Sequence, residues 1–375
     1  MKILLAPDKF RGSLTALEVC NAMEKGVRAA FPTAKVIALP MADGGEGTVE
    51  ILTQNAGGTL VNCTVQDPLG RSIQTFFGRT PDRNTAFLEM ASASGLKWLV
   101  QNERNPLKTS TYGTGQLIAN AVEAGAKKII LGIGGSATTD AGIGMAAALG
   151  WKFLDKNGQE LVPVGENLVY IEKIIPTKIP LDIAIDVACD VTAPLFGHAG
   201  AAYLYGPQKG ATDEAIEWLD KGLQQIASVV QRDFGVDLAQ IPGTGAAGGI
   251  GFGLLFFLNA TLKEGVNIVI EQTRFEEQLE GVDLVLTGEG KMDAQTLQGK
   301  LIAGIARASK ARGIPVMALC GTQLLTPKEI HSLGLTYATS ILHRPMSLPE
   351  AVEYAYQGVT ETTHSLVSML FFLQQ

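Results

Sequence analysis

The chain is 375 residues long, 46% hydrophobic and 18% charged. It is therefore long enough for two packed domains, and its hydrophobic content is too high for extensive disorder. Its net charge is −7 and its basic residues form no stripe, which argues against a nucleic-acid partner. Four cysteines without CxxC or Cys/His pairing do not predict disulfides or structural zinc. The apolar N-terminal strand is too short for a signal peptide, and no apolar run reaches the ~20 residues of a membrane span. We therefore expect a cytoplasmic protein without membrane contact.

Strands and helices alternate at the start of the chain. Residues 2–6 and 35–39 predict short strands. Residues 13–30 and 45–55 predict helices, the first capped by Ser13 and the second ended by Gly57-Gly58. A β-α-β-α order with glycine-rich loops after the strands is typical of a parallel α/β sheet.

The pattern changes after Gly58. Three β-branched and aromatic segments separated by turns predict antiparallel strands at 59–65, 72–78 and 85–90. The following segments predict strands at 128–132 and 182–188, and helices at 112–123, 138–149, 212–234 and 248–260. The last of these helices carries no charge, and we expect it in a core.

From Val282 the β-α alternation resumes. Strands are predicted at 283–287, 315–319 and 337–341, with helices at 301–311, at 327–332 and from Leu348 onward. Together with the first two strands these make five, which predicts a flavodoxin-like parallel-sheet domain of residues 1–60 plus 281–375. Residues 61–280 would then form an inserted second α/β domain. Ligands of such sheets bind at the carboxyl ends of the strands near the switch point between the first and third strands, where Asp8-Lys9 and Gly288-Glu289 lie.

Five glycine-dense segments carry most of the polar chemistry: residues 42–48, 132–140, 188–192, 243–249 and 287–293. Glycine lets backbone N–H groups approach an anion, hydroxyls add donors, and carboxylates hold the Mg²⁺ that accompanies a nucleotide. Glu289 and Asp293 are the candidate metal ligands. The candidates for binding substrate or phosphate are Arg11, Asp43, Gly44, Gly45, Glu46, Gly134, Gly135, Ser136, Thr138, Thr139, Asp140, Thr244, Gly245, Gly248, Gly249 and Lys291.

Several of these segments have a second interpretation. Residues 132–137 match G-x-G-x-x-A, so an NAD(P)-dependent oxidoreductase of a small hydroxy acid is the alternative function, and a tight strand-to-helix turn is the structural one. Asp190 is either a cap or a general base, with Asp186 as its rival. The glycines of 243–253 serve either phosphate N–H contacts or a close helix crossing. The chain contains no P-loop and no protein-kinase signature, so any kinase here has another architecture.

The motifs Asp8-Lys9-Phe10-Arg11-Gly12-Ser13, Asp43-Gly44-Gly45-Glu46-Gly47-Thr48, Gly134-Gly135-Ser136-Ala137-Thr138-Thr139-Asp140, Gly243-Thr244-Gly245-Ala246-Ala247-Gly248-Gly249 and Gly288-Glu289-Gly290-Lys291-Met292-Asp293 closely resemble the type 1 glycerate kinase family. The resemblance spans nearly the full chain. It implies ATP- and Mg²⁺-dependent phosphorylation of D-glycerate, usually at the 2-hydroxyl to give 2-phosphoglycerate, and a flavodoxin-like domain with an inserted α/β domain. Arg11 and Thr192 stand where Lys and Asn are typical of the family.

The resemblance suggests a mechanism of in-line phosphoryl transfer in a cleft between the domains. As hypotheses, Asp190 orients the hydroxyl as base, and Asp8 and Lys9 also belong to the catalytic group. Lys9 and Lys291 would neutralise phosphate or carboxylate charge, and Asp43, Glu289 and Asp293 would bind Mg²⁺ or hydroxyls. Residues 134–139 and 244–249 would hold anionic groups. The expected partners are ATP and glycerate, and an oligomer is compatible with the sequence.

Overall fold

The computed structural model describes residues 1–45, 47–178, 182–298 and 301–372, and the chain forms two compact units. Unit 1 is Met1–Asp43 with Val266–Gln375, and unit 2 is Gly44–Gly265. The junctions lie at 43/44 and 265/266, whereas the sequence suggested 60/61 and 280/281, because α2 (Thr48–Asn55) packs on strands of unit 2. Within the described residues, no helix has both the length and the apolar character needed to cross a membrane.

The protein is an α/β protein with two main sheets, as predicted. The sheet of unit 1 has five parallel strands in the order β13-β12-β11-β1-β2. Numbered along the unit, this order is 2-1-3-4-5. The elements of unit 1 are β1 (Lys2–Leu5), α1 (Ala16–Ala30), β2 (Lys35–Ala38), α9 (Gly265–Gln272, which begins at the junction), α10 (Phe275–Gln278), β11 (Leu284–Met292), η5 (Thr296–Gln298), α11 (Leu301–Lys310), β12 (Val316–Gln323), α12 (Pro327–Ser332), β13 (Tyr337–Ser340) and α13 (Leu348–Phe372).

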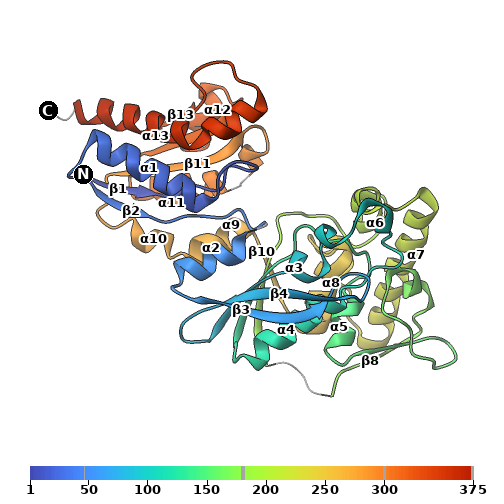
Figure 1. Ribbon diagram of the computed structural model, residues 1–375. Helices are drawn as coiled ribbons and strands as arrows, with labels where there is room; N and C mark the ends of the chain where they lie inside the picture. Colours follow the sequence, from blue (N-terminus) through green and yellow to red (C-terminus); the bar gives the residue numbers. More distant parts are fainter. Residues whose placement is uncertain (46, 179–181, 299–300, 373–375) are drawn as a thin grey trace. The chain divides into compact units, whose positions relative to one another are not determined.

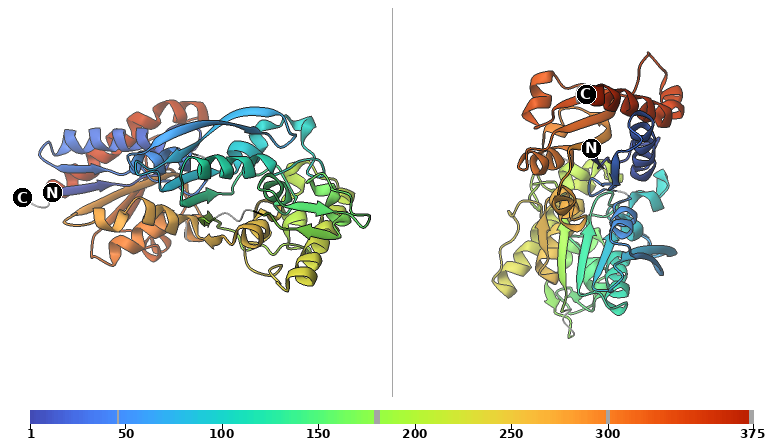
Figure 2. Two further views of the ribbon diagram at one scale, coloured as in Figure 1. Left: turned by 90° about the horizontal axis from the view of Figure 1, so that it is seen from below. Right: turned by 90° about the vertical axis from the view of Figure 1, so that its left-hand side faces the viewer.

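Helices α1 and α13 pack against each other on unit 1, and Figures 1 and 2 show them side by side. The first helix begins at Ala16 rather than near Ser13, because Thr15 and Glu18 form a reciprocal capping box. A Cβ on Gly26 would lie 2.5 Å from Thr360 O, so this glycine permits the close approach of the two helices. The contact buries apolar side chains such as Val27, each worth roughly 1.5–3 kcal/mol.

Strand β11 is longer than the sequence predicted. The apolar segment ends at Thr287, but the strand continues through the polar residues to Met292, because β12 continues to pair with it as far as Gln323. A Cβ on Gly288 would lie 2.3 Å from Leu319 O, so the glycine allows this close pairing. The polar motif that follows the predicted strand is therefore itself held in a strand, and its side chains alternate between the two faces of the sheet.

The main sheet of unit 2 has six strands in the order β10-β9-β6-β5-β4-β3. Strands β10, β9, β6 and β5 are parallel, and β5, β4 and β3 are antiparallel, as their turns predicted. The elements are α2, β3 (Thr59–Gln66), β4 (Ser72–Arg79), β5 (Thr85–Glu89), α3 (Ala91–Ser94), η1 (Leu96–Trp98), η2 (Gln101–Glu103), α4 (Tyr112–Glu123), β6 (Lys128–Gly132), α5 (Ile143–Ala148), β7 (Lys152–Leu154), η3 (Gly165–Tyr170), β8 (Lys173–Ile175), β9 (Ala184–Ala188), α6 (Ala201–Tyr205), η4 (Pro207–Lys209), α7 (Asp213–Phe234), α8 (Ala246–Leu258) and β10 (Thr261–Lys263). Strands β7 and β8 form a separate two-stranded sheet.

One predicted helix of unit 2 begins later than expected, and another is irregular in its first turn. The helix expected over 138–149 is α5, and residues 138–142 form a loop because Ala141 and Gly142 have φ of 51° and 74°. The helix expected over 248–260 is α8, but Ala247, Gly248 and Gly249 inside it have left-handed conformations. Regular helical geometry in α8 therefore starts after Gly249.

Candidate functional site

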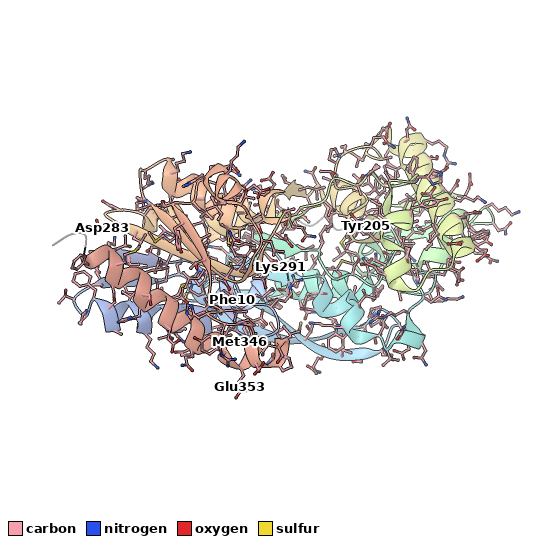
Figure 3. All side chains as sticks on the ribbon, turned by 90° about the horizontal axis from the view of Figure 1, so that it is seen from above. Phe10, Tyr205, Asp283, Lys291, Met346 and Glu353 are labelled. Carbon is pink, nitrogen blue, oxygen red and sulfur yellow. The ribbon has the colours of Figure 1, made fainter. Side chains whose placement is uncertain are left out.

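A charged cavity of about 370 Å³ lies at the carboxyl ends of the strands of unit 1. Strands β1 and β11 are neighbours, and β2 pairs with the other side of β1, so this is the switch point of the sheet. The cavity brings together seven residues predicted from the sequence, with Gly290 and Gln295 completing the lining: Asp8, Lys9, Arg11, Asp43, Glu289, Lys291 and Asp293. Figure 3 labels Asp283, just before β11, and Lys291 near the other end of that strand.

Asp8 is the most buried carboxylate of this cavity, with 7% of its surface exposed. Its Oδ1 accepts a hydrogen bond from Lys9 N at 2.7 Å. Burial, reinforced by the negative charge of Asp43, raises the pKa of Asp8 to about 7. A carboxyl group with a pKa near neutral pH suits the role of a general base.

Two cationic side chains face Asp43. Lys9 Nζ lies 4.0 Å from Asp43 Oδ1, and Arg11 Nη2 lies 3.7 Å from Asp43 Oδ2. The Arg11 side chain is 81% exposed, whereas those of Lys9 and Asp43 are about one quarter exposed. The exposure of Arg11 leaves its guanidinium accessible to an anionic ligand.

The polar end of β11 and the loop after it contribute the second half of the cavity. Thr296 Oγ1 donates a hydrogen bond to Glu289 Oε1 at 2.7 Å, and it accepts one from Asp293 N at 3.2 Å. Lys291 Nζ lies 2.9 Å from Asp293 Oδ2. A Cβ on Gly290 would lie 3.1 Å from Arg11 N, so the strand passes close to the loop after β1. Both candidate metal ligands are thus connected through one threonine.

The donor set of this cavity fits Mg²⁺ carried by a nucleotide. Mg²⁺ prefers oxygen ligands and in phosphoryl-transfer sites takes one or two protein carboxylates, with phosphates and waters for the rest. Glu289 and Asp293 are two such carboxylates. No group of three or more His, Cys, Asp or Glu side chains that could hold a metal was found over the described part of the chain. The residues therefore suit a metal that arrives with its phosphates rather than one held by a complete protein cage.

Asp190 and Gly44 lie at the carboxyl ends of the parallel strands of unit 2. Asp190 follows β9, is exposed, and its Oδ1 accepts a hydrogen bond from Gly265 N at 2.7 Å. A Cβ on Gly44 would lie 4.0 Å from Asp190 Oδ2, and one on Gly132 would lie 3.3 Å from Gly44 O. Gly44, at φ +83°, therefore passes beside the ends of β6 and β9. Gly45 O accepts hydrogen bonds from Thr48, and Glu46 lies outside the described residues.

Asp186, the alternative to Asp190 as general base, forms ion pairs that join strands of the sheet. It lies inside β9, and its Oδ2 is 3.0 Å from Lys128 Nζ and 2.9 Å from Lys263 Nζ. Burial opposes its ionisation, but hydrogen bonds from the two lysines prevail and lower the pKa of Asp186. Asp186 therefore joins the neighbouring strands β6 and β10 to β9.

Glu89 is a carboxylate that sequence reasoning missed. It ends β5, and its Oε1 accepts a hydrogen bond from Val49 N at 3.2 Å, in the first turn of α2. Helix α2 has no side-chain cap of its own because Gly47 precedes it. Burial raises the pKa of Glu89, and the helix terminus favours its negative charge. The sequence signal for this site was a glutamate directly after the apolar run Ala86-Phe87-Leu88.

The loop after β6 has two exposed glycines, and backbone hydrogen bonds hold its other residues. Gly134 and Gly135 are exposed, and a Cβ on Gly134 would meet nothing within 4 Å. Ala137 N donates to Ser94 O at 2.9 Å, and Leu96 N donates to Gly135 O at 3.0 Å. The backbone around Gly134 is therefore open to a ligand while the rest of the loop is held by the protein.

Asp140 is a buried residue at the end of the same loop. It is fully buried, and its Oδ2 accepts hydrogen bonds from both N and Oγ1 of Thr111 at 2.8 Å. Gly142 N and Gly144 N donate to the same carboxylate at 3.2 and 3.3 Å. Burial raises the pKa of Asp140, although these hydrogen bonds oppose the rise. The geometry shows Asp140 stabilising the loop, and its binding of phosphate stays a prediction.

Lys209 is a buried cation that sequence reasoning also missed. It is 1% exposed, and its Nζ donates to Thr138 O at 2.5 Å. Burial lowers the pKa of Lys209 to about 7, although the charge of Asp140 opposes this shift. The nearby hydroxyls of Thr138 and Thr139 are buried and have no hydrogen-bond partner among the described residues. A lysine at the end of a short 3₁₀ turn gives no sequence signal of such burial.

The glycines of the 243–249 segment serve close packing within unit 2. A Cβ on Gly248 would lie 1.9 Å from Thr138 O, and one on Gly249 would lie 3.0 Å from Ala141 Cα, in the 138–142 loop. Thr244 Oγ1 donates to Ala239 O at 3.0 Å. These contacts show close packing against the 138–142 loop rather than the helix crossing expected from the sequence, and a phosphate contact stays a prediction for Thr244, Gly245, Gly248 and Gly249.

The 132–137 loop does not have the form of a dinucleotide fingerprint. That motif opens a helix directly, so that the pyrophosphate meets the helix N-terminus. Here the next helix, α5, begins only at Ile143. The structure therefore does not support the oxidoreductase alternative.

The fold and the charged cavity define an α/β protein whose candidate site combines carboxylates with cationic side chains at the carboxyl edge of a parallel sheet. The model of the glycerate kinase family matches residues 3–371. A glycerate kinase of Halalkalibacterium halodurans is 44% identical over 354 residues, covering 94% of this chain and 93% of that protein. The glycerate 2-kinase of Escherichia coli K12 is 42% identical over 373 residues, covering 99% of this chain and 98% of that protein. A solved structure from Salmonella typhimurium LT2 has a TM-score of 0.91 and 42% identity, covering 100% of this chain and 99% of that one.

The chain therefore belongs to the glycerate kinase family and is a phosphotransferase. This confirms the resemblance found in its motifs. Membership of a kinase family implies ATP as the phosphoryl donor.

Proposed function

We propose that the protein transfers the γ-phosphoryl group of ATP to D-glycerate, at the 2-hydroxyl, to give 2-phosphoglycerate. The cavity at the carboxyl edge of the unit 1 sheet carries this proposal, because four carboxylates and three cationic side chains meet there. Phosphoryl transfer depends chiefly on positioning and on neutralising charge, and this set of side chains offers both. The name glycerate 2-kinase of the Escherichia coli relative supports the 2-hydroxyl as acceptor.

In this proposal Lys9 and Lys291 neutralise phosphate charge, with Arg11 as an exposed third cation. Glu289 and Asp293 hold Mg²⁺, which bridges phosphate oxygens and disperses their charge when bound. The exposed backbone at Gly134 is the group of unit 2 that suits an anionic substrate. The inter-domain cleft expected from the sequence stays a prediction.

Two carboxylates compete for the role of base. Asp190, the residue predicted from sequence, is exposed, and its Oδ1 accepts a hydrogen bond from the backbone N–H of Gly265. Asp8 is buried with a pKa of about 7, which suits proton transfer at neutral pH. We propose Asp8 as the group that accepts the hydroxyl proton and Asp190 as a group that orients substrate.

The reaction is tested by incubating the protein with ATP, Mg²⁺ and a panel of hydroxy acids, following ADP, and locating the phosphate on the product by ³¹P NMR. Activity on other hydroxy acids but none on glycerate would refute the substrate. Phosphate on the 3-hydroxyl would refute the position.

The base is tested with Asp8→Asn and Asp190→Asn, with Glu217→Gln on an exposed turn of α7 as control. We expect Asp8→Asn to lower kcat about 10²–10⁴-fold, because removing a general base has that effect. Asp190→Asn should act mainly on KM for glycerate. If Asp190→Asn lowers kcat by that factor and Asp8→Asn does not, the two roles are reversed.

The 2-1-3-4-5 strand order supports assigning unit 1 to the flavodoxin-like class. Unit 2, with its own mixed sheet, is then the inserted α/β domain. Limited proteolysis near 43/44 and 265/266 tests this division, because cleavage at both junctions should leave three protected fragments, 1–43, 44–265 and 266–375, with the first and third held together as unit 1.

A further inference from the structure

Thr296 is a buried threonine beside the charged cavity of unit 1, in contact with Glu289 of its lining. Only 1% of its surface is exposed, whereas Glu289 is half-buried. The threonine begins η5, and the glutamate lies in β11, seven residues earlier. A buried hydroxyl group needs hydrogen-bond partners, so its partners indicate what the side chain does.

The direction of the Thr296 hydroxyl proton follows from its two partners. Asp293 N can only donate, so Thr296 Oγ1 accepts from it, at 3.2 Å. An ionised carboxylate can only accept, so the hydroxyl donates its proton to Glu289 Oε1, at 2.7 Å. Hydrogen bonds to an ionised group are among the stronger ones in proteins. Thr296 therefore holds one oxygen of Glu289 in a defined place.

Three hydrogen bonds close the turn that carries Thr296. Besides the bond from Asp293 N to the hydroxyl, Thr296 N donates to Asp293 O at 2.9 Å. Gln295 N donates to Asp293 Oδ1, also at 2.9 Å. The turn begins directly after β11 ends at Met292, so the strand fixes its start. The hydroxyl therefore stays in place and does not follow the glutamate into other rotamers.

The backbone of Glu289 is held on both sides. Glu289 pairs with Cys320 of β12. On the other side, Gly288 O accepts a hydrogen bond from Asp8 N at 2.8 Å. The freedom that remains lies in the side-chain torsions of the glutamate, and a long carboxylate side chain loses much rotamer entropy when it is ordered. The hydrogen bond from Thr296 restricts these torsions before a ligand arrives.

This ordering is important for Mg²⁺. The ion requires near-ideal octahedral geometry with ligands at about 2.0–2.1 Å, so a carboxylate in the wrong rotamer is a poor ligand. A carboxylate has about four acceptor positions, so it can accept a hydrogen bond and bind a metal at the same time. Loss of a group that orients a metal ligand typically lowers metal affinity or activity by about 10–100-fold.

We propose that Thr296 is a positioning residue that orients Glu289 for Mg²⁺, and that it thereby determines how much the metal strengthens nucleotide binding. This inference rests on the proposed function, since it concerns the metal of that reaction. It adds to the site a residue that lies outside the cavity lining.

The test uses the full chain and two variants at this position. Thr296→Val has nearly the same shape without the hydroxyl, and Thr296→Ser keeps the hydroxyl. Thr360→Val, in α13 and outside the cavity lining, is the matched control, because its hydroxyl also donates a hydrogen bond, to Tyr356 O. Calorimetry gives the Kd of a non-hydrolysable ATP analogue with Mg²⁺ and with EDTA, and the ratio of the two values is the gain due to the metal. Thermal melting verifies that each variant is folded.

We expect Thr296→Val to reduce this gain by about tenfold or more, as loss of an orienting group does. Thr296→Ser and Thr360→Val should keep the gain within about twofold, and the Kd in EDTA should change no more than that in any variant. An undiminished gain in Thr296→Val would overturn the proposal. An equal loss in Thr296→Ser would overturn it as well, because packing rather than the hydroxyl would then be responsible. The absence of any gain in the wild type would have the same effect.

These measurements need no glycerate, so they are independent of the proposed reaction. A protein that makes no phosphoglycerate, but loses the gain in Thr296→Val and keeps it in Thr296→Ser, would refute the reaction and support the positioning role. A protein that makes 2-phosphoglycerate with an undiminished gain in Thr296→Val would support the reaction and refute the positioning role.

Discussion

Replacing Asp8 by Asn should raise stability and remove activity at the same time. The carboxyl group of Asp8 is buried, and its pKa is raised from 3.8 to about 7. The folded chain therefore binds more protons than the unfolded chain between these values, so the ionised side chain destabilises the fold increasingly as pH rises from 3.8 to 7. About three pKa units at about 1.4 kcal/mol each give a destabilisation of about 4 kcal/mol above pH 7, as an upper bound.

Asn keeps an oxygen that can accept the hydrogen bond from Lys9 N and carries no charge. Denaturant unfolding of wild type and Asp8→Asn at pH 8, 6 and 4 should show a stabilisation that is largest at pH 8 and nearly absent at pH 4. The kcat/KM of the wild type should rise through pH 7 as Asp8 loses its proton.

A constant difference in unfolding free energy between pH 4 and pH 8 would refute the burial argument for Asp8. A flat pH–rate profile between pH 6 and 8 would refute its role as base. Asp283→Asn, at an exposed position of the same unit, is the control for general effects of charge.

Two further predictions concern unit 2. The first replaces Lys209 by Met. The pKa of Lys209 is about 7 in the folded chain and 10.5 as its ordinary value, so the free energy of unfolding of the wild type should rise with pH between these values. Denaturant unfolding at pH 7 and 9.5 should show this rise in the wild type and not in Lys209→Met, and an equal rise in both would contradict the burial of the ammonium group. Gly248→Ala places a Cβ 1.9 Å from Thr138 O at φ +80° and should lower the free energy of unfolding by more than ~2 kcal/mol. Gly235→Ala, at φ +70° with no atom within 4 Å of the new Cβ, should lower the free energy of unfolding by only ~1 kcal/mol. An equal loss of unfolding free energy in the two variants would show that the backbone conformation, and not the contact with Thr138 O, sets the cost.

The sequence predicted most of the unit 1 site because parallel strands bring their carboxyl ends to one edge. Asp8, Lys9 and Asp43 follow the first two strands, and Glu289 lies near the end of the third, so chain order sufficed to place them together. The extension of β11 to Met292 was not predictable, because its polar residues carry no strand periodicity and are held by pairing with β12.

The roles of residues in unit 2 depended on contacts between distant segments. Asp140 and Gly248 look like ligand-binding residues in sequence, yet one accepts hydrogen bonds from Thr111 and the other packs on Thr138. Glu89 and Lys209 gave little signal, because their burial depends on segments 40 and 71 residues away. Local patterns record which residues are polar, and they do not record which polar groups the fold itself satisfies.

By itself, the sequence determined the α/β class, the five strands of unit 1, the charged cluster at their ends and the family. Hydrophobic periodicity and short motifs are local properties, and they are sufficient for these conclusions. Only the tertiary structure decided that burial raises the pKa of Asp8 to about 7 and that Gly248 packs closely on Thr138. These properties follow from burial and from pairing between distant segments, because desolvation and hydrogen-bond partners exist only once the chain has folded.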